Sequence, residues 1–109
     1  MNPLQSVDKR VLPYATALLQ AAFQLSSGVH VTSAKRSIAD QRRLYAAYVA
    51  GRSKYPAAAP GSSKHETGRA FDIGGLSSSQ LAQLGALWES WGGRWGGNFR
   101  AKDEIHFEV

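Results

Sequence analysis

The chain has 109 residues, no cysteine, and 13 Lys and Arg against 8 Asp and Glu, for a formal net charge of +5. This length fits one domain, residues 1–109, and the lack of cysteine excludes disulfide bonds and thiolate metal sites. No apolar run approaches the roughly 20 residues that span a bilayer, so membrane insertion is not expected. The positive charge leaves nucleic acid, acidic lipid, an anionic cell wall or simple solvation open.

The first third of the chain predicts an unstructured lead at residues 1–6, then a helix and a strand. Pro13 is tolerated only near a first helical turn, which places the start of the helix close to it, and Gly28 ends the helix. Residues 29–32 are mostly β-branched and predict a strand. His30 lies in that strand without a ligand-type partner nearby, so we assign it a structural role. Apolar residues recur at helical spacing between about residues 8 and 26: Val11, Leu12, Ala15, Leu18, Leu19, Ala22 and Phe23.

A second helix is expected from Ser37, a good N-cap residue, to about Ala50. Gly51 ends it. Residues 51–64 contain Gly, Ser, Pro and Ala with little periodicity, which predicts a surface loop long enough to be functional. On the buried side of this helix we expect Leu44, Tyr45, Tyr48 and Val49.

The last part of the chain predicts a strand at residues 69–73, a third helix capped by residues 77–79, and a final strand at residues 104–108. Residues 91–97 hold four glycines and two tryptophans, which either wall a substrate groove or plug the core. The fold class is therefore α+β, with about three helices packed on a small, mostly antiparallel sheet. The core side of the third helix is expected to carry Leu81, Leu84, Leu87, Trp88 and Trp91.

Two distant segments offer candidate metal ligands. His65 and Asp72 lie seven residues apart with Gly68 between them, so a turn can bring them together; a surface histidine and a turn aspartate remain the alternative. Near the end of the chain, Asp103 is expected in a turn, with His106 pointing inward from the final strand. Two imidazoles and one carboxylate suit catalytic zinc, because three protein ligands leave a fourth position for water. The remaining carboxylate can then move protons.

Two glutamates compete with these aspartates. On strand alternation Glu104, His106 and Glu108 share one face, so Glu104 stays an open rival for the proton-transfer role. For Glu108 we favour a solvated position on an edge strand.

Three segments in the right order resemble one family. Ser63-Lys-His-Glu-Thr-Gly-Arg-Ala-Phe-Asp72 looks like the Ser-x-His-x-x-Gly-x-Ala-x-Asp motif of zinc peptidases that cut bacterial cell-wall peptides. That family includes D-alanyl-D-alanine carboxypeptidases and phage L-alanyl-D-glutamate endopeptidases of the hedgehog/DD-peptidase fold. Asp103-Glu-Ile-His-Phe-Glu108 resembles its second motif, and Thr32-Ser-Ala-Lys-Arg-Ser37 its upstream segment, with Ala34-Lys35 in place of Gly-Tyr. Residues 91–99 resemble the Trp-Gly-Gly stretch of the endolysin branch.

The resemblance implies zinc on His65, Asp72 and His106, with Asp103 as the catalytic acid and base. It also implies that Arg36 binds or polarises the substrate. Candidates to contact the substrate or support the ligands are Ser63, Gln41 and Trp95.

The expected function is zinc-dependent hydrolysis of an amide bond in the peptidoglycan stem peptide. Asp103 rather than Glu, together with the following His-Phe, favours an L-alanyl-D-glutamate endopeptidase, as in a phage or prophage endolysin. A D-alanyl-D-alanine carboxypeptidase and a non-catalytic zinc-containing binding module are the alternatives. We expect a monomer without specific nucleic-acid binding. No signal peptide is recognisable, so we expect synthesis in the cytoplasm and action on the periplasmic or extracellular wall after release.

Overall fold

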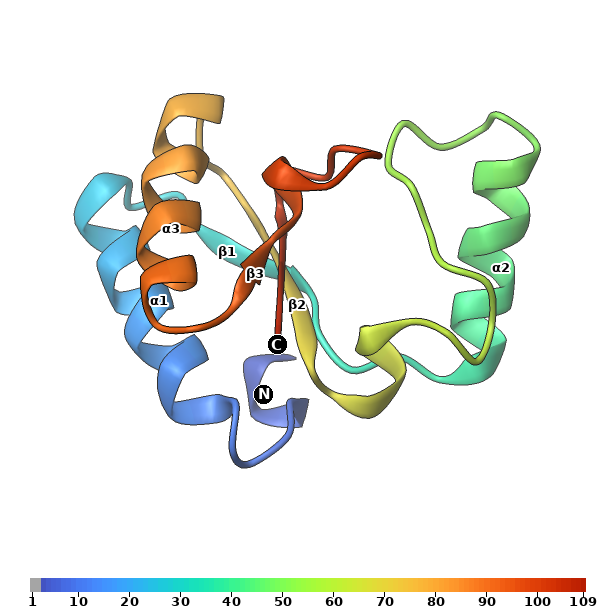
Figure 1. Cartoon of the computed structure of the whole chain (residues 1–109), viewed down its shortest axis with the longest axis horizontal. Helices are drawn as coiled ribbons and strands as arrows, with labels where there is room; N and C mark the ends of the chain where they lie inside the picture. The colour runs from blue at the N-terminus through green and yellow to red at the C-terminus, as the bar shows by residue number, and fades with distance from the viewer. Residues whose placement is uncertain (1–2) are drawn as a thin grey trace.

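The computed structural model describes residues 3–109, and Figure 1 shows its arrangement. Helices α1 and α3 lie side by side on one side of the strands, and α2 stands apart on the other side. The expected α+β class, with three α-helices on a small antiparallel sheet, is confirmed. The elements in order are η1 (Pro3–Ser6), α1 (Leu12–Leu25), β1 (His30–Ser33), α2 (Ile38–Val49), η2 (Lys64–Thr67), β2 (Ala70–Gly74), α3 (Ser78–Ser90), β3 (Arg94–Trp95), η3 (Gly96–Asn98) and β4 (His106–Glu108).

The sheet has the order β1-β2-β4-β3, and every neighbouring pair is antiparallel. The last strand of the chain therefore lies in the interior of the sheet, between β2 and β3. Its register on β2 places His106 directly opposite Asp72 and Phe107 opposite Phe71. This pairing brings together two candidate ligands that are 34 residues apart in the sequence.

Strand alternation divides β2 and β4 into two faces. Phe71 and Phe107 are fully buried and stack with ring centroids 5.7 Å apart, and Trp88 of α3 meets Phe71 edge-on at 5.3 Å. These rings form the core with α1 and α3. Asp72 and His106, next to these rings in their strands, therefore point to the opposite face, where they line a cavity together with residues of α2.

The expected unstructured lead is wrong for its described part, while residues 1 and 2 lie outside the described residues. Pro3–Ser6 forms a short 3-10 helix, and Leu4 is buried in the core with 1% of its surface exposed. A single apolar residue carries no periodicity, so this packing could not be predicted from a local pattern.

The buried face expected for α2 is also wrong. Leu44, Tyr48 and Val49 are 37%, 40% and 66% exposed, and Tyr45 is only half-buried. The one fully buried side chain of the helix is that of Gln41. The reason is tertiary: α2 does not cover the apolar face of the sheet, so its apolar residues have no core to enter. Its predicted start is correct, because the Ser37 side chain accepts a hydrogen bond from the Asp40 backbone N–H.

Candidate metal centre

His65 is held by a short, tightly capped turn. The Ser63 hydroxyl accepts from the His65 backbone N–H, and the Glu66 carboxylate accepts from the Ser63 backbone N–H, which is a capping box around η2. Gly68 ends the turn at φ 73°, and a Cβ there would lie 2.7 Å from the backbone nitrogen of Asp8. Only glycine fits this position without strain. The motif thus fixes the backbone that presents His65, whose side chain is 2% exposed.

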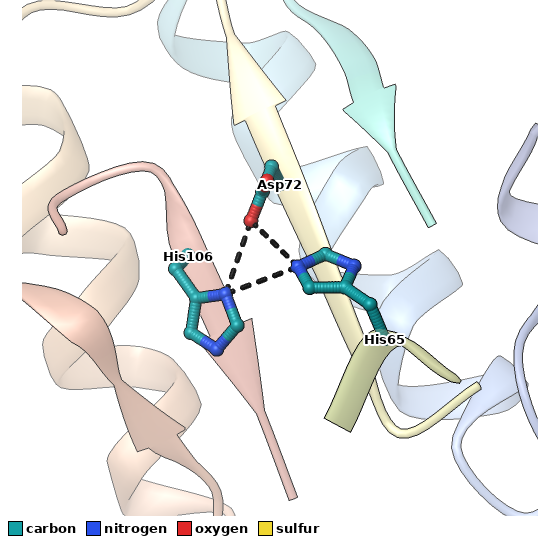
Figure 2. A group of neighbouring side chains, drawn as sticks. All are labelled: His65, Asp72 and His106. Atoms are coloured by element: carbon teal, nitrogen blue, oxygen red, sulfur yellow. Dashed lines mark hydrogen bonds and ion pairs between the residues drawn. The ribbon is translucent and has the colours of Figure 1, made fainter. Parts of the chain in front are cut away.

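Three side chains converge on one point (Figure 2). Asp72 Oδ1 lies 3.2 Å from His65 Nε2 and 3.1 Å from His106 Nδ1, and the two ring nitrogens are 3.2 Å apart. The three residues are buried and come from η2, β2 and β4. Within residues 3–109 no other group of three His, Asp or Glu residues brings its ligand atoms so close.

The size of this triangle fits a tetrahedral metal ion. Zinc binds histidine nitrogen and carboxylate oxygen at about 2.0–2.2 Å, which sets tetrahedral ligand atoms about 3.3–3.6 Å apart. The observed edges of 3.1 to 3.2 Å need only a small expansion to reach that geometry. A donor set of two imidazoles and one carboxylate also suits zinc chemically.

Each of the three candidate ligands has a second partner that orients it. The His65 Nδ1–H donates to the Ala34 carbonyl at 2.7 Å, which leaves Nε2 to face the centre. His106 Nε2–H donates to Glu108 Oε1 at 2.8 Å, which leaves Nδ1 to face it. Arg36 Nη2 donates to Asp72 Oδ2 at 3.1 Å, so Oδ1 is the oxygen turned inward. Metal-binding histidines typically carry such a partner on the other ring nitrogen.

Glu108 was expected on a solvated edge strand, and this expectation is wrong. Its strand β4 is an interior strand and the residue is 7% exposed. Strand alternation correctly indicated that Glu108 shares a face with His106. It could not indicate that β3 pairs with the outer edge of β4 and so makes β4 an interior strand.

The charges of the cluster shift its pKa values strongly. Burial alone would raise the pKa of Asp72, but hydrogen bonds with His106 and His65 outweigh it and hold the pKa well below its usual range. Burial alone would lower the pKa of His106, but hydrogen bonds with Asp72 and Glu108 raise it to about 9. His106 therefore retains a proton on the ring that faces Asp72 Oδ1 and His65 Nε2. A divalent cation bound between these atoms would replace that proton.

Asp103 lies beside the cluster, in the turn before β4, as expected. Its backbone N–H donates to the Gly96 carbonyl, and its own carbonyl accepts from the His106 N–H. Its Oδ1 is buried and has no hydrogen-bond partner within residues 3–109. Burial, and then repulsion from Asp72, raise the pKa of this carboxyl group to about 6. A buried carboxylate oxygen without a partner is costly, and such groups often have a functional role.

The cluster and Asp103 open into one cavity of about 520 Å³. This volume is in the range of ligand-binding clefts. One wall is formed by the candidate ligands and β4, and the other by α2 and the loop that follows it. The second wall includes Leu44, Tyr48, Tyr55, Pro56 and Ala58.

A family sequence model described as VanY, D-alanyl-D-alanine carboxypeptidase, matches residues 4–97, which is most of the chain. The chain belongs to the VanY family. The resemblance that the motifs suggested is thereby confirmed. The matched region includes His65 and Asp72 and ends before Asp103 and His106, so the second half of the candidate site rests on the geometry described above.

Solved structures of peptidoglycan peptidases share the fold of this VanY-family chain. The L-Ala D-Glu endopeptidase ChiX of Serratia marcescens matches with a TM-score of 0.63 and 24% identity, over 98% of this chain and 83% of its own. A mutant VanY D,D-pentapeptidase in complex with Zn(II) matches with a TM-score of 0.70 and 21% identity, over 94% of this chain and 72% of its own. The LdcB LD-carboxypeptidase matches with a TM-score of 0.74 and 24% identity, over 99% of this chain and 66% of its own. No curated protein matches the chain in sequence.

Arg36 and Gln41 of this VanY-family chain form a network behind the cluster. Besides Asp72, Arg36 donates from Nε to Ser33 Oγ and from Nη1 to Gln41 Oε1. Gln41, fully buried, donates in turn to the Ala58 carbonyl at 2.8 Å. Among residues 3–109, three of the five guanidinium N–H groups are thus used, and two are left for another acceptor. The structure places Arg36 at the cavity, and Gln41 where it joins Arg36 to the loop.

Three other polar or aromatic candidates lie elsewhere. Trp95 packs against Gly85 of α3 and donates to the Glu104 carbonyl, so it plugs the core and does not line the cavity. The Glu104 carboxylate accepts from Ser78 Oγ and is also absent from the cavity wall. His30 is exposed and donates to the Gly28 carbonyl, away from the cluster. Ser63 does line the cavity, although its hydroxyl caps η2.

Proposed function

We propose that this chain is a zinc-dependent peptidoglycan peptidase that hydrolyses an amide bond of the stem peptide. The observation that carries the proposal is that one cavity contains both the three-atom ligand cluster and the unpartnered carboxylate of Asp103. A metal-binding module without activity has no use for a buried carboxylate at that position. Membership of the VanY family and the folds of ChiX and LdcB support the substrate class.

In the proposed mechanism, His65, Asp72 and His106 would hold a zinc ion, which would supply the Lewis acidity that activates water near neutral pH. Asp103 accepts a proton from the attacking water and passes it to the amine that leaves when the C–N bond breaks. The two unused N–H groups of Arg36 stabilise the negative charge that develops on the carbonyl oxygen, an effect typically worth about 3 kcal/mol per donor.

We propose the L-alanyl-D-glutamate bond as the one cleaved. Asp at position 103, with His106-Phe107 after it, resembles the endopeptidase branch, and ChiX carries that activity in its name. On the same grounds we propose that the protein acts as an endolysin-type enzyme, as a monomer, on the wall outside the membrane. Among the described helices, none is long and apolar enough to span a bilayer.

The second candidate is a D-alanyl-D-alanine carboxypeptidase, which the family description favours. The solved structure of VanYB in complex with D-alanine-D-alanine shares the fold of this chain at 21% identity. The two activities leave different products. An endopeptidase exposes a new amino terminus on D-glutamate, whereas a carboxypeptidase releases one D-alanine and leaves the rest of the stem intact.

The test is digestion of purified peptidoglycan, with mass spectrometry of the fragments, with and without a chelator and with zinc restored. We expect fragments that begin with D-glutamate, loss of activity with chelator and recovery with zinc. Release of D-alanine alone would replace the endopeptidase with the carboxypeptidase. Absence of any cleavage by zinc-loaded protein would remove the enzyme hypothesis.

A further inference from the structure

Glu108 lies closer to His106 than the three candidate ligands lie to one another. Its Oε1 is 2.8 Å from His106 Nε2, whereas the contacts among the three candidate ligands are 3.1 to 3.2 Å. The carboxylate is almost completely buried. A buried carboxylate is retained at low cost only when it is paired and hydrogen-bonded. Nothing in the proposed proton transfer uses Glu108, so its burial beside His106 needs another explanation.

The chemistry of imidazole supplies one. A neutral histidine carries its proton on one ring nitrogen, and only the other nitrogen has a lone pair for a metal. An ionised carboxylate accepts hydrogen bonds and donates none. Glu108 therefore requires the proton of His106 to be on Nε2, which leaves the lone pair on Nδ1, the atom that faces Asp72 and His65.

We propose that Glu108 is a positioning residue that fixes the tautomer and ring orientation of His106 so that Nδ1 is presented to zinc. This inference rests on the proposed function, since it concerns the same metal site. Glu108 is neither one of the three expected ligands nor the expected acid and base. The proposal therefore adds a residue to the site.

The rest of the sheet holds Glu108 in place. Arg94 of β3 is its direct partner in the register, and Arg94 Nη1 lies 3.4 Å from the other carboxylate oxygen. The carbonyl of Glu108 accepts from Trp88 Nε1 at 2.9 Å. The core tryptophan thus fixes the backbone of Glu108, whereas Arg94, with 66% of its side chain exposed, adds only a long contact to the carboxylate. The closest partner of the carboxylate is His106.

A purely structural role for Glu108 makes a different prediction. In that case, substitution lowers the stability of the sheet, while the folded protein binds zinc as before. The proposed role requires that the zinc affinity of the folded protein changes and that the change follows the ability of residue 108 to accept from His106 Nε2.

The experiment compares Glu108→Leu, which removes the acceptor, with Glu108→Gln, which keeps an acceptor oxygen at the same length. Arg94→Gln is the matched control, since it touches Glu108 but not His106. Zinc affinity is measured by competition with a chromophoric chelator. The NMR chemical shifts of the imidazole nitrogens in the zinc-loaded protein show which nitrogen carries the proton. We expect Glu108→Leu to bind zinc about 10–100-fold more weakly, Glu108→Gln to lose less than about tenfold, and Arg94→Gln to stay close to the parent.

Glu108→Leu with unchanged zinc affinity and a proton still confined to His106 Nε2 would overturn the proposal. If this variant does not fold, Glu108→Asp takes its place, because it keeps the charge but withdraws the oxygen by one methylene. It should weaken zinc binding, and unchanged affinity would again overturn the proposal. These readouts need no peptidoglycan. If zinc binding depends on Glu108 but no cleavage occurs, only the proposed function fails. If cleavage occurs but zinc affinity does not depend on residue 108, only this inference fails.

Discussion

The two walls of the cavity are built in different ways. On one side, the candidate ligands sit on β2, β4 and a capped turn, are buried, and each have a second hydrogen-bond partner. On the other side, α2 and residues 51–64 present half-exposed side chains such as Leu44, Tyr48 and Tyr55. One wall is fixed by the sheet, and in the other Gln41 joins α2 to Arg36 and to the Ala58 carbonyl of the loop.

This difference separates two tasks. A metal site requires ligand atoms held within a few tenths of an ångström, which buried and doubly bonded side chains provide. Recognition of a peptide tolerates more variation, and exposed side chains on a loop and a loosely packed helix suit it. Substitutions on the sheet side should therefore change zinc binding and chemistry, and those on the α2 side should change substrate affinity alone.

The largest effect is expected from His106→Ala. It removes one of three ligand atoms and leaves Asp72 and Glu108 without their shared partner. We expect loss of stoichiometric zinc in metal analysis of the purified protein and cleavage reduced to background. Retention of one tightly bound zinc per chain would show that the ligand set is different from the one described.

Asp103→Asn tests the acid and base separately from the metal. The change preserves size but removes a basic oxygen, and loss of such a group typically lowers turnover by about 10²–10⁴-fold. Zinc content should stay at the parental level, because Asp103 is not one of the three converging groups. Loss of zinc together with activity would instead make Asp103 a ligand.

Arg36→Ala should have an intermediate effect. The substitution removes the group that turns Asp72 Oδ1 inward and leaves a buried carboxylate oxygen unpaired. We expect turnover or zinc affinity to fall about 10–100-fold, measured by peptidoglycan cleavage and chelator competition. Arg42→Ala, an exposed arginine on α2, is the control, and equal effects of the two would reduce Arg36 to a surface charge.

Tyr48→Ala tests the opposite wall. Tyr48 is 40% exposed and lines the cavity, so its loss should raise KM several-fold while zinc affinity is unchanged. Because the side chain is not in the core, we expect stability to change by less than about 0.5 kcal/mol. Val49→Ala, next to it and outside the cavity wall, is the matched control. Weaker zinc binding in Tyr48→Ala would contradict the division between the walls.

The smallest effect is expected from Glu104→Gln. This carboxylate accepts from Ser78 Oγ on the side away from the cavity, so cleavage and zinc content should both stay within about twofold of the parent, as for ordinary surface substitutions. An inactive but folded Glu104→Gln protein would transfer the role of base from Asp103 to Glu104.

The features predicted correctly from the sequence are local ones. Ser37 and Ser77 cap their helices as expected, and the expected helices and strands are present with shifts of a few residues at their ends. Pro13 marks the start of the first helix as expected, since α1 begins at Leu12. Capping and helical periodicity are decided by residues within one or two turns, so a sequence displays them directly.

The errors share the opposite origin. Three features were predicted wrongly: the exposed face of α2, the buried Leu4 and the interior position of Glu108. Each depends on which secondary-structure element packs over another, and no local pattern encodes this. The sequence left two positions possible for Trp95, a substrate groove or the core. Its packing against Gly85 of α3 shows that it lies in the core.

By itself, the sequence determined the residue types, their order and the two short motifs that bring His65 near Asp72 and Asp103 near His106. Only the tertiary structure decided that β4 inserts between β2 and β3, which places His106 against Asp72 and encloses Glu108 behind it. The physical reason is that strand order and register are set by long-range packing of faces such as Phe71 on Phe107, whose partners are distant in the chain.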